Sequence, residues 1–374
     1  AAHTINLPSS PSAGDEVAII QYGSNAITVG RNGSNINGSA TDDSVERNGA
    51  LHYVYSSSAT IGWAKVNRDS TSSFVEATGG TVTTSGDFKI HTFNSSSNFV
   101  VSALSGTAAN NEVSYIVVAG GASSGNNVGA EKGTGGGGAG GFRESKSGVD
   151  SYTASPLEGA TNITVTQTTY PITVGAGGAG FNSPNANAGN SGSNSVFSTI
   201  TSAGGGGGSD DDAPNGPGGR NGGSGGGSGG GANSNNTAGQ GNTPPVSPPQ
   251  GNNGGAATSP DGQGNQGSGG GGATEVGYNN NSAPGARDGD GGTGATTNIS
   301  GSPVAYAGGG SAGAVPGRPA GTAGPGGGGT GGTTGSTGGS GTTNKGGGGG
   351  GGGQCAAGGS GGSGVVILRY KYQN

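Results

Sequence analysis

The sequence predicts an all-β N-terminal module followed by a glycine-rich domain of short strands and polyglycine II helices, with essentially no α-helix. Short runs of β-branched and aromatic residues alternate with Gly, Asn, Asp and Ser turn signals from the start of the chain. No stretch places apolar residues at the spacing of an amphipathic helix. Of 374 residues, 95 are Gly, whereas ordinary proteins contain about 7%, and these glycines gather in tracts.

Residues 1–69 form the first zone, a β-rich module. Turn signals at Ser12–Gly14, Arg31–Gly33 and Asn48–Gly49 separate its apolar runs. We therefore expect strands at Val17–Tyr22, Ala26–Val29, Leu51–Tyr55 and Ile61–Val66.

Residues 70–118 continue as strands that lead into the glycine-rich zone. The expected strands are Gly80–Thr84, Phe88–Phe93, Phe99–Ala103 and Val113–Val118. Because the first two flank the turn Ser85–Asp87, we expect them to form a hairpin.

Residues 119–374 form the glycine-rich zone, in which Gly tracts alternate with polar stretches of variable length. Short strands are expected within it at Ile163–Val165, Tyr170–Val174 and Val196–Ile200. The zone closes on an apolar strand at 365–370. A disordered tail would not need such a strand, so we expect it to pair with Tyr115–Val118 or Tyr170–Val174 and to close the domain.

The Gly tracts have two interpretations. An isolated tract is typical of a flexible linker. Here the tracts recur and strands bracket them, which favours a bundle of polyglycine II helices joined by lateral backbone hydrogen bonds. In such a bundle we expect Ala139, Ser224 and Ser228 to face outward, and the variable loops to protrude from the ends of a rigid platform.

Composition excludes several classes of protein. The net charge is −6 without a basic patch, so nucleic acid is not an expected partner. No apolar run reaches the ~20 residues of a membrane-spanning helix, so membrane insertion is not expected. The single cysteine, Cys355, allows no disulfide within the chain. Because the chain contains no Met, we expect a processed N-terminus or the C-terminal part of a longer product.

No residue pattern indicates catalysis. We expect His52 and His91 to be strand-surface residues, and His3 belongs to no catalytic pattern. The carboxylate groups Asp15–Glu16, Asp42–Asp43 and Asp210–Asp212 lie in expected turns or loops rather than as a glycosidase pair. Residues 287–292 faintly resemble a calcium loop but lack its further acidic ligands. We therefore expect no enzyme activity, no catalytic residue, no cofactor and no metal.

A binding role points to exposed loop residues. Contact surfaces favour Tyr, Arg and Asn on loops that a rigid scaffold holds. The candidate receptor-contact residues are Arg220, Asn221, Tyr278, Asn279, Arg287, Tyr306 and Arg318.

The first zone carries three recognisable motifs: Ile5–Val17, Ile27–Ala40, and Val54 to Trp63. Together they cover roughly 65 residues and resemble a repeat module of phage tail fibres, especially those of phages that infect marine cyanobacteria. The segment Thr41–Arg47 departs from that module, which usually has a more apolar strand here. The resemblance therefore does not predict the pairing of this segment.

The remainder resembles the glycine-rich C-terminal domain of phage structural proteins. The residues that carry this resemblance are Gly79–Phe93, Tyr115–Gly121, Tyr170–Gly178, Asn194–Phe197 and Gly361–Tyr370. A looser likeness, of architecture only, is to the tail-fibre tip adhesins of T-even-type phages. These resemblances imply a trimeric fibre region for the first zone and a receptor-contacting tip for the rest.

We therefore expect a virion structural protein, the distal tail fibre or adhesin, which is extracellular and binds a host cell-surface receptor. Its expected partners are a host surface glycan or outer-membrane protein, other fibre or virion proteins, and two further copies in a homotrimer. The alternatives are a head fibre or capsid decoration protein of a phage, an extracellular glycine-rich structural protein, and a depolymerase. Location on the virion distinguishes the head fibre or decoration protein from the tail fibre. Regular Gly repeats would indicate the extracellular structural protein, and release of oligosaccharides would indicate the depolymerase.

Overall fold

The computed structural model describes residues 3–21, 26–45, 50–66, 74–126, 132–181, 187–210, 218–230, 237–257, 266–280 and 287–373. Within these ranges the regular structure is β-strand apart from one short 3-10 helix, η1 (Ala108–Asn111), so the predicted all-β fold without α-helix is confirmed. No helix in the described ranges is long and apolar enough to cross a membrane. The chain divides into two compact units, unit 1 (Ala1–Ser73) and unit 2 (Phe74–Asn374).

Unit 1 contains two three-stranded sheets. The first has the order β1 (His3–Asn6), β3 (Ile27–Gly30), β4 (Asp43–Val45), and the second has the order β2 (Glu16–Ile20), β5 (Ala50–Tyr55), β6 (Trp63–Val66). Tyr53 and Trp63, both fully buried, pack in the core with Leu7, Ile19, Val29, Ile36 and Val45. The segment that departs from the resembled module contains a strand, β4, which is antiparallel to β3. The parallel strand β1 was not expected from the sequence.

Unit 2 is built on two larger sheets and one two-stranded pair. The six-stranded sheet contains β8 (Thr81–Ser85), β9 (Phe88–Phe93), β19 (Val365–Lys371), β11 (Glu112–Val118) and β12 (Phe142–Ser145) in that order, and β13 (Ile163–Thr164) also pairs with β11. The five-stranded sheet contains β7 (Glu76–Thr78), β10 (Ser97–Ala103), β14 (Thr169–Thr173), β15 (Ser195–Phe197) and β16 (Ile200–Ser202). The pair is β17 (Ala295–Thr297) with β18 (Val304–Tyr306).

The closing strand lies inside the six-stranded sheet. β19 is antiparallel to β11 on one side and to β9 on the other, so the predicted pairing with Tyr115–Val118 is confirmed. The other candidate partner, Tyr170–Val174, lies in the other sheet, where β14 pairs with β10 and β15. Because Val118 is the register partner of Val365, the chain leaves the sheet and returns to it at paired residues. The predicted β8–β9 hairpin is also confirmed.

Both faces of the six-stranded sheet are buried at β11 and β19, which explains the continuous apolar runs of these two strands. Tyr115, Val117 and Leu368 point into one cluster, which also contains Phe99 and Phe197 from the five-stranded sheet. Their alternate neighbours Ile116, Val118 and Ile367 point into a second cluster with Phe142, Ile299 and Tyr306. This period of two residues is the ordinary alternation of a strand.

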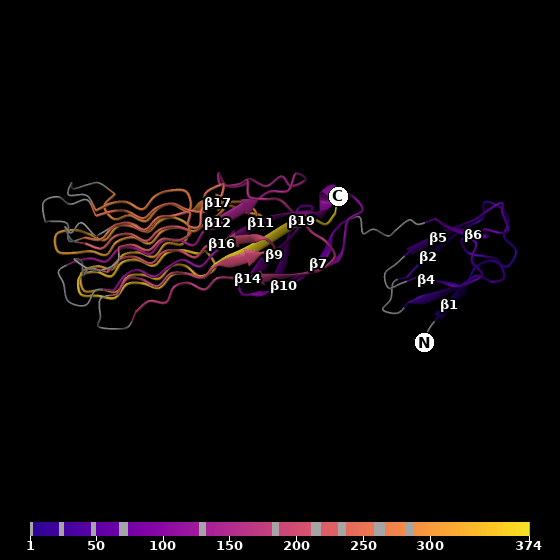
Figure 1. Cartoon of the computed structure of the whole chain (residues 1–374), viewed down its shortest axis with the longest axis horizontal. Helices are drawn as coiled ribbons and strands as arrows, with labels where there is room; N and C mark the ends of the chain where they lie inside the picture. Colours follow the sequence, from indigo (N-terminus) through magenta and orange to yellow (C-terminus); the bar gives the residue numbers. More distant parts are fainter. Residues whose placement is uncertain are drawn as a thin grey trace. The chain divides into compact units, whose positions relative to one another are not determined.

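The glycine tracts run side by side from the sheets to the opposite end of unit 2, which we call the distal end (Figure 1). The tract of residues 132–141 shows how they are joined. Its N–H groups donate to three neighbouring tracts in turn, so that every third residue faces the same neighbour. Gly135, Gly138 and Gly141 donate to Ser209, Gly206 and Ala203; Gly136 and Ala139 donate to Ser268 and Gly271; Gly137 and Gly140 donate to Gly349 and Gly346.

The carbonyl groups of the same tract accept from three further tracts. Gly136 accepts from Gly227, Gly137 from Gly310 and Gly138 from Ala122. A helix with three residues per turn and only lateral hydrogen bonds is polyglycine II. Since each bond contributes about 0.5–1.5 kcal/mol net, this lattice of backbone bonds offsets the ordering cost that the small apolar core cannot.

The outward orientation expected for the small side chains within the tracts was wrong. Ala139, Ser224 and Ser228 are all fully buried. Ala139 packs in the second apolar cluster, where the bundle meets the sheet. The Ser228 hydroxyl donates to the Ser268 hydroxyl on a neighbouring tract at 3.1 Å. Small side chains therefore fill particular interior positions where adjacent tracts leave room for them.

The surface position expected for His91 was also wrong, because its side chain is fully buried. His91 Nδ1 lies 2.7 Å from the Gly79 carbonyl oxygen, and Nε2 lies 3.0 Å from the Tyr370 hydroxyl. Burial lowers its pKa below the ordinary value of 6.5, the Gly79 carbonyl opposes this, and the charge of Lys89 adds to it. His52, by contrast, lies beside Glu16 at 3.2 Å on a more accessible strand.

The buried imidazole predicts a pH dependence of unit 2. As the pH falls below 6.5, the unfolded chain takes up the His91 proton before the folded chain does. The stability that neutral His91 contributes to the folded state is thus fully present above pH 6.5. It declines below that pH, by at most about 1.4 kcal/mol per pH unit. Calorimetric melting of wild type and His91→Gln between pH 7.5 and 5.5 checks this, because the variant should show a flatter profile. Equal slopes in the two proteins would contradict it.

Candidate functional site

Turns between tracts gather at the distal end of unit 2 (Figure 1). Among the described residues there, Val315 and Arg318 close a tight turn through reciprocal backbone hydrogen bonds of 3.1 and 2.9 Å. Ser336 N–H donates to Thr333 O at 2.8 Å, and Ala356 N–H donates to Gly353 O at 3.0 Å, in two more turns. The underlying bundle holds these polar turns through many backbone hydrogen bonds, so it is a rigid support for side-chain display.

A cluster of Tyr278, Arg287, Glu275 and Asp290 joins adjacent tracts of the bundle. The Arg287 guanidinium lies 3.9 Å from the centre of the Tyr278 ring. It pairs with Glu275 at 3.1 Å and with Asp290 at 3.3 Å, and it also donates to the Tyr278 hydroxyl. The Tyr278 hydroxyl in turn donates to Glu275. About half of the Arg287 side chain remains exposed, so the cluster is both ordered and accessible.

Glu275 is held as a carboxylate in this cluster. Burial raises its pKa, but hydrogen bonds from Thr293 and Tyr278 and the charge of Arg287 outweigh burial, so its pKa lies below the ordinary value. The carboxylate therefore stays paired with Arg287 at neutral pH. The cluster can offer a ligand an aromatic ring, guanidinium N–H groups and carboxylate oxygens, which is the chemistry of a polar binding surface.

The structure brings together only two of the seven predicted contact residues, Tyr278 and Arg287. Arg220 is exposed at the side of the bundle, where its backbone N–H donates to Gly207 O at 2.8 Å. Arg318 lies in the distal turn with Val315. Tyr306 is only 5% exposed and packs in the second apolar cluster. It is therefore a core residue of strand β18, and we no longer assign it a contact role.

Asn221 and Asn279, the two predicted asparagines, are exposed and also hydrogen-bond to the backbone of a neighbouring tract. The side-chain oxygen of Asn221 accepts from Gln240 N–H at 2.7 Å, and that of Asn279 accepts from Ala256 N–H at 2.8 Å. Each amide thus replaces a backbone carbonyl and joins two tracts at the edge of the bundle. Since the side-chain oxygen of each asparagine already accepts a hydrogen bond, its NH₂ group is the donor left for a ligand.

Glu275, Asp290 and Thr293 were missed from the sequence. The only signal was the acidic segment after Arg287, which faintly resembles a calcium loop. In the structure Asp290 instead accepts from Arg287 Nε and from Thr322 N–H, the latter at 2.6 Å. In the described ranges no group of three or more His, Cys, Asp or Glu side chains is placed to hold a metal ion.

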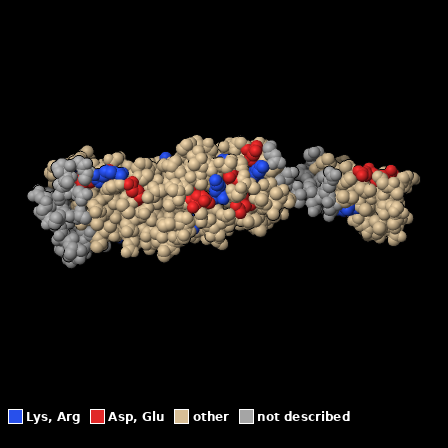
Figure 2. All heavy atoms as spheres, turned by 90° about the horizontal axis from the view of Figure 1, so that it is seen from above, with Lys and Arg blue, Asp and Glu red and all other residues tan. Residues whose placement is uncertain are grey.

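One face of the molecule is mostly uncharged. In the view of Figure 2, charged side chains occur as small groups of mixed sign on a wide neutral surface. A partner that contacts the tract surfaces would therefore meet mainly Gly, Ser, Thr and Asn rather than a strong electrostatic field.

Comparison with known families gives a match over most of unit 2. A family model described as a glycine-rich domain matches residues 94–371. This chain belongs to the glycine-rich domain family. The glycine-rich domain begins after β9 and ends with β19, so it includes every tract of the bundle, while β7, β8 and β9 precede it. A comparison with curated proteins gave no match.

Proposed function

We propose that this glycine-rich domain protein is a virion structural protein, the distal part of a phage tail fibre, which binds a host cell-surface receptor. The observation that carries the proposal is the bundle itself. Its tracts are bonded laterally, and one set of its turns lies at the end away from the sheets. A scaffold of this kind displays variable loops at little conformational cost, as binding proteins require.

The resemblance of the first zone to fibre modules supports the same proposal. Unit 1 also exposes several apolar side chains, with Ile20 at 57%, Ile61 at 44% and Ile5 and Val66 at 40%. We propose that two further copies of the chain cover them in a homotrimer. Light scattering of the purified chain tests this through the mass, and a monomeric mass at micromolar concentration would contradict it.

The receptor is proposed to be a surface glycan or an outer-membrane protein. The cluster around Tyr278 and Arg287 supports this because both residue types are frequent in the energetically dominant parts of interfaces. We expect the labelled chain to bind cells of a susceptible marine cyanobacterial strain saturably. Tyr278→Ala with Arg287→Ala should weaken binding about 30-fold or more, since each truncation of a contact residue costs on the order of 1–2 kcal/mol and the two together cost about 2–4 kcal/mol.

The matched control is Lys89→Ala, which removes a cation from β9 in the six-stranded sheet, outside the bundle. It should bind like wild type. Unchanged binding of the double variant would remove this cluster from the receptor surface.

A head fibre or capsid decoration protein is the alternative location. Immunogold labelling of virions with antibody against the chain separates the two, because label at the tail tip supports the fibre and label on the capsid overturns it. Incubation with host envelope polysaccharide tests the proposed lack of enzyme activity, and release of oligosaccharides would contradict it.

A further inference from the structure

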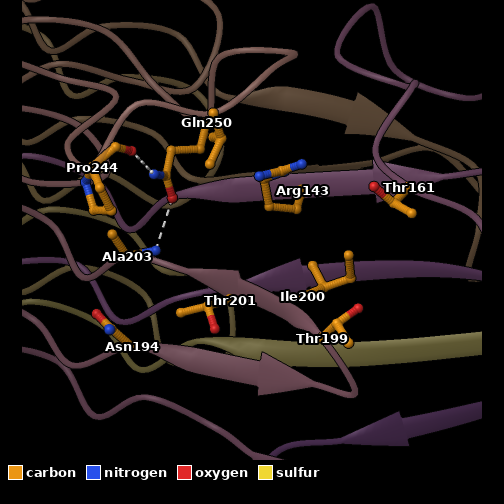
Figure 3. Close-up of a pocket in the computed structure, with 10 residues that line it drawn as sticks. Arg143, Thr161, Asn194, Thr199, Ile200, Thr201, Ala203, Pro244 and Gln250 are labelled. Atoms are coloured by element: carbon orange, nitrogen blue, oxygen red, sulfur yellow. Dashed lines mark hydrogen bonds between the residues drawn. The ribbon is translucent and has the colours of Figure 1, made fainter.

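A groove of about 320 Å³ lies at the sheet end of the bundle, beside β12 and the β15–β16 hairpin. Its volume is within the range of small-molecule sites, about 300–1,000 Å³. Figure 3 shows Arg143 on one wall between Gln250 and Thr161, with Asn194 and Thr201 below. The remaining lining residues are Thr199, Ile200, Ala203, Pro244 and Val246, so the lining contains no acidic residue.

Arg143 is a buried cation without a counter-charge. It is only 8% exposed, and no ion pair among the described residues includes it. One guanidinium nitrogen donates to the Ser247 carbonyl at 3.3 Å, whereas a guanidinium has five N–H donors. Burial lowers the pKa of Arg143, although the Tyr115 hydroxyl opposes this. Buried guanidinium groups are usually paired with an anion, and the described residues supply none here.

The walls around Arg143 are held in place. Gln250 is 1% exposed, its Oε1 accepts from Ala203 N–H at 2.8 Å, and its Nε2 donates to Pro244 O at 2.8 Å. Asn194 Oδ1 accepts from Gly204 N–H at 2.9 Å, which leaves its NH₂ group available. A ligand would therefore meet a largely preformed site.

Three exposed threonines line the groove: Thr161, Thr199 and Thr201. None of their hydroxyls has a hydrogen-bond partner within the described ranges. Ile200 and Val246 add an apolar surface. The groove thus combines one guanidinium, several free hydroxyls and an amide with a small apolar face.

We propose that this groove binds a small acidic saccharide, a uronic-acid type sugar, with its carboxylate on the Arg143 guanidinium. Guanidinium and carboxylate match in bidentate geometry. The hydroxyls of Thr199 and Thr201 and the Asn194 amide then meet sugar hydroxyls, and Ile200 and Val246 contact the C–H face of the ring. This inference does not depend on the proposed fibre function, because it concerns a site at the sheet end and a soluble ligand.

The test is titration of the full chain with galacturonic acid and with galactose at pH 7, followed by NMR or calorimetry. We expect galacturonic acid to bind and galactose to bind at least tenfold more weakly. Arg143→Gln should weaken galacturonic acid binding at least tenfold, and Arg143→Lys should weaken it less. Thr201→Trp, at an exposed position, fills the groove while Arg143 stays in place, so it should also abolish binding. Arg31→Gln removes an arginine from unit 1 and should bind like wild type.

Calorimetric melting verifies that each variant is folded, and if Arg143→Gln is unfolded, Thr201→Trp decides. Absence of galacturonic acid binding to the wild type would overturn the inference. So would equal binding of galactose, or unchanged binding in folded Arg143→Gln or Thr201→Trp. Inorganic sulfate that binds as tightly as galacturonic acid would overturn the saccharide assignment, because it would show an unselective anion site. Loss of cell adsorption without loss of galacturonic acid binding would concern the receptor proposal alone.

Discussion

Gly136→Ala will destabilise unit 2 severely. A Cβ atom on Gly136 would lie 2.1 Å from the carbonyl oxygen of Gly310 and 3.0 Å from that of Ser311. These are backbone atoms of a neighbouring tract, so no side chain can rotate away. To accommodate the methyl group, the two tracts must move apart by about an ångström, which weakens their lateral hydrogen bonds. Overpacking of an ordinary core costs about 1–3 kcal/mol, and we expect this substitution to cost 3 kcal/mol or more.

Gly148→Ala is the matched control. A Cβ there meets nothing within 4 Å, and Gly148 lies in a turn after β12. The substitution restricts the unfolded chain, so we expect a change between zero and a gain of about 1 kcal/mol. Calorimetry of wild type and both variants measures the difference. A Gly136→Ala protein that melts together with Gly148→Ala would contradict the close-packed bundle.

Removal of one partner from the buried Arg369–Asp150 ion pair is the second large effect. Arg369 Nε lies 3.0 Å from Asp150 Oδ2, and their side chains are 6% and 0% exposed. Ser114 also donates to Asp150, and Arg369 lies 4.5 Å from the centre of the Phe88 ring. Asp150→Asn leaves a guanidinium buried among apolar groups without its counter-charge. We expect a loss of about 3–5 kcal/mol, and a similar loss for Arg369→Met.

The double variant Asp150→Asn with Arg369→Met removes both charges together. Its loss should therefore be smaller than the sum of the two single losses. Arg287→Gln is the comparison at an exposed pair and should cost less than about 1 kcal/mol. Denaturant unfolding of the wild type and the four variants measures these values. Additive losses at Arg369 and Asp150 would show that the pair does not act as a unit.

The strands were predictable wherever side chains alternate or form apolar runs. The hairpin around Ser85–Asp87 follows from its turn residues, and β19 was recognisable because Val365–Leu368 is apolar without interruption. Strands β17 and β18 were missed, because Ala295–Thr297 and Val304–Tyr306 are too short to show a pattern. The same limit caused Tyr306 to be taken as a loop residue, although it lies in the core.

The candidate sites were less predictable than the strands. Tyr278 and Arg287 were recognisable by residue type, but their partners Glu275 and Asp290 depend on which tracts are adjacent. Arg143 showed no sequence signal, since its local sequence is an ordinary short strand. Its groove exists only because the loop containing Pro244 and Gln250 folds against β12 and the β15–β16 hairpin.

The sequence by itself determined that this protein is all-β, that its glycines can form laterally bonded polyglycine II helices, and that its last strand closes the domain. Only the tertiary structure decided which tracts are neighbours, which small side chains are buried, and where charged groups meet. The physical reason is that a glycine tract has no side chain to encode its partner. Its neighbours are therefore set by register in backbone hydrogen bonds and by the strands and loops that hold its ends.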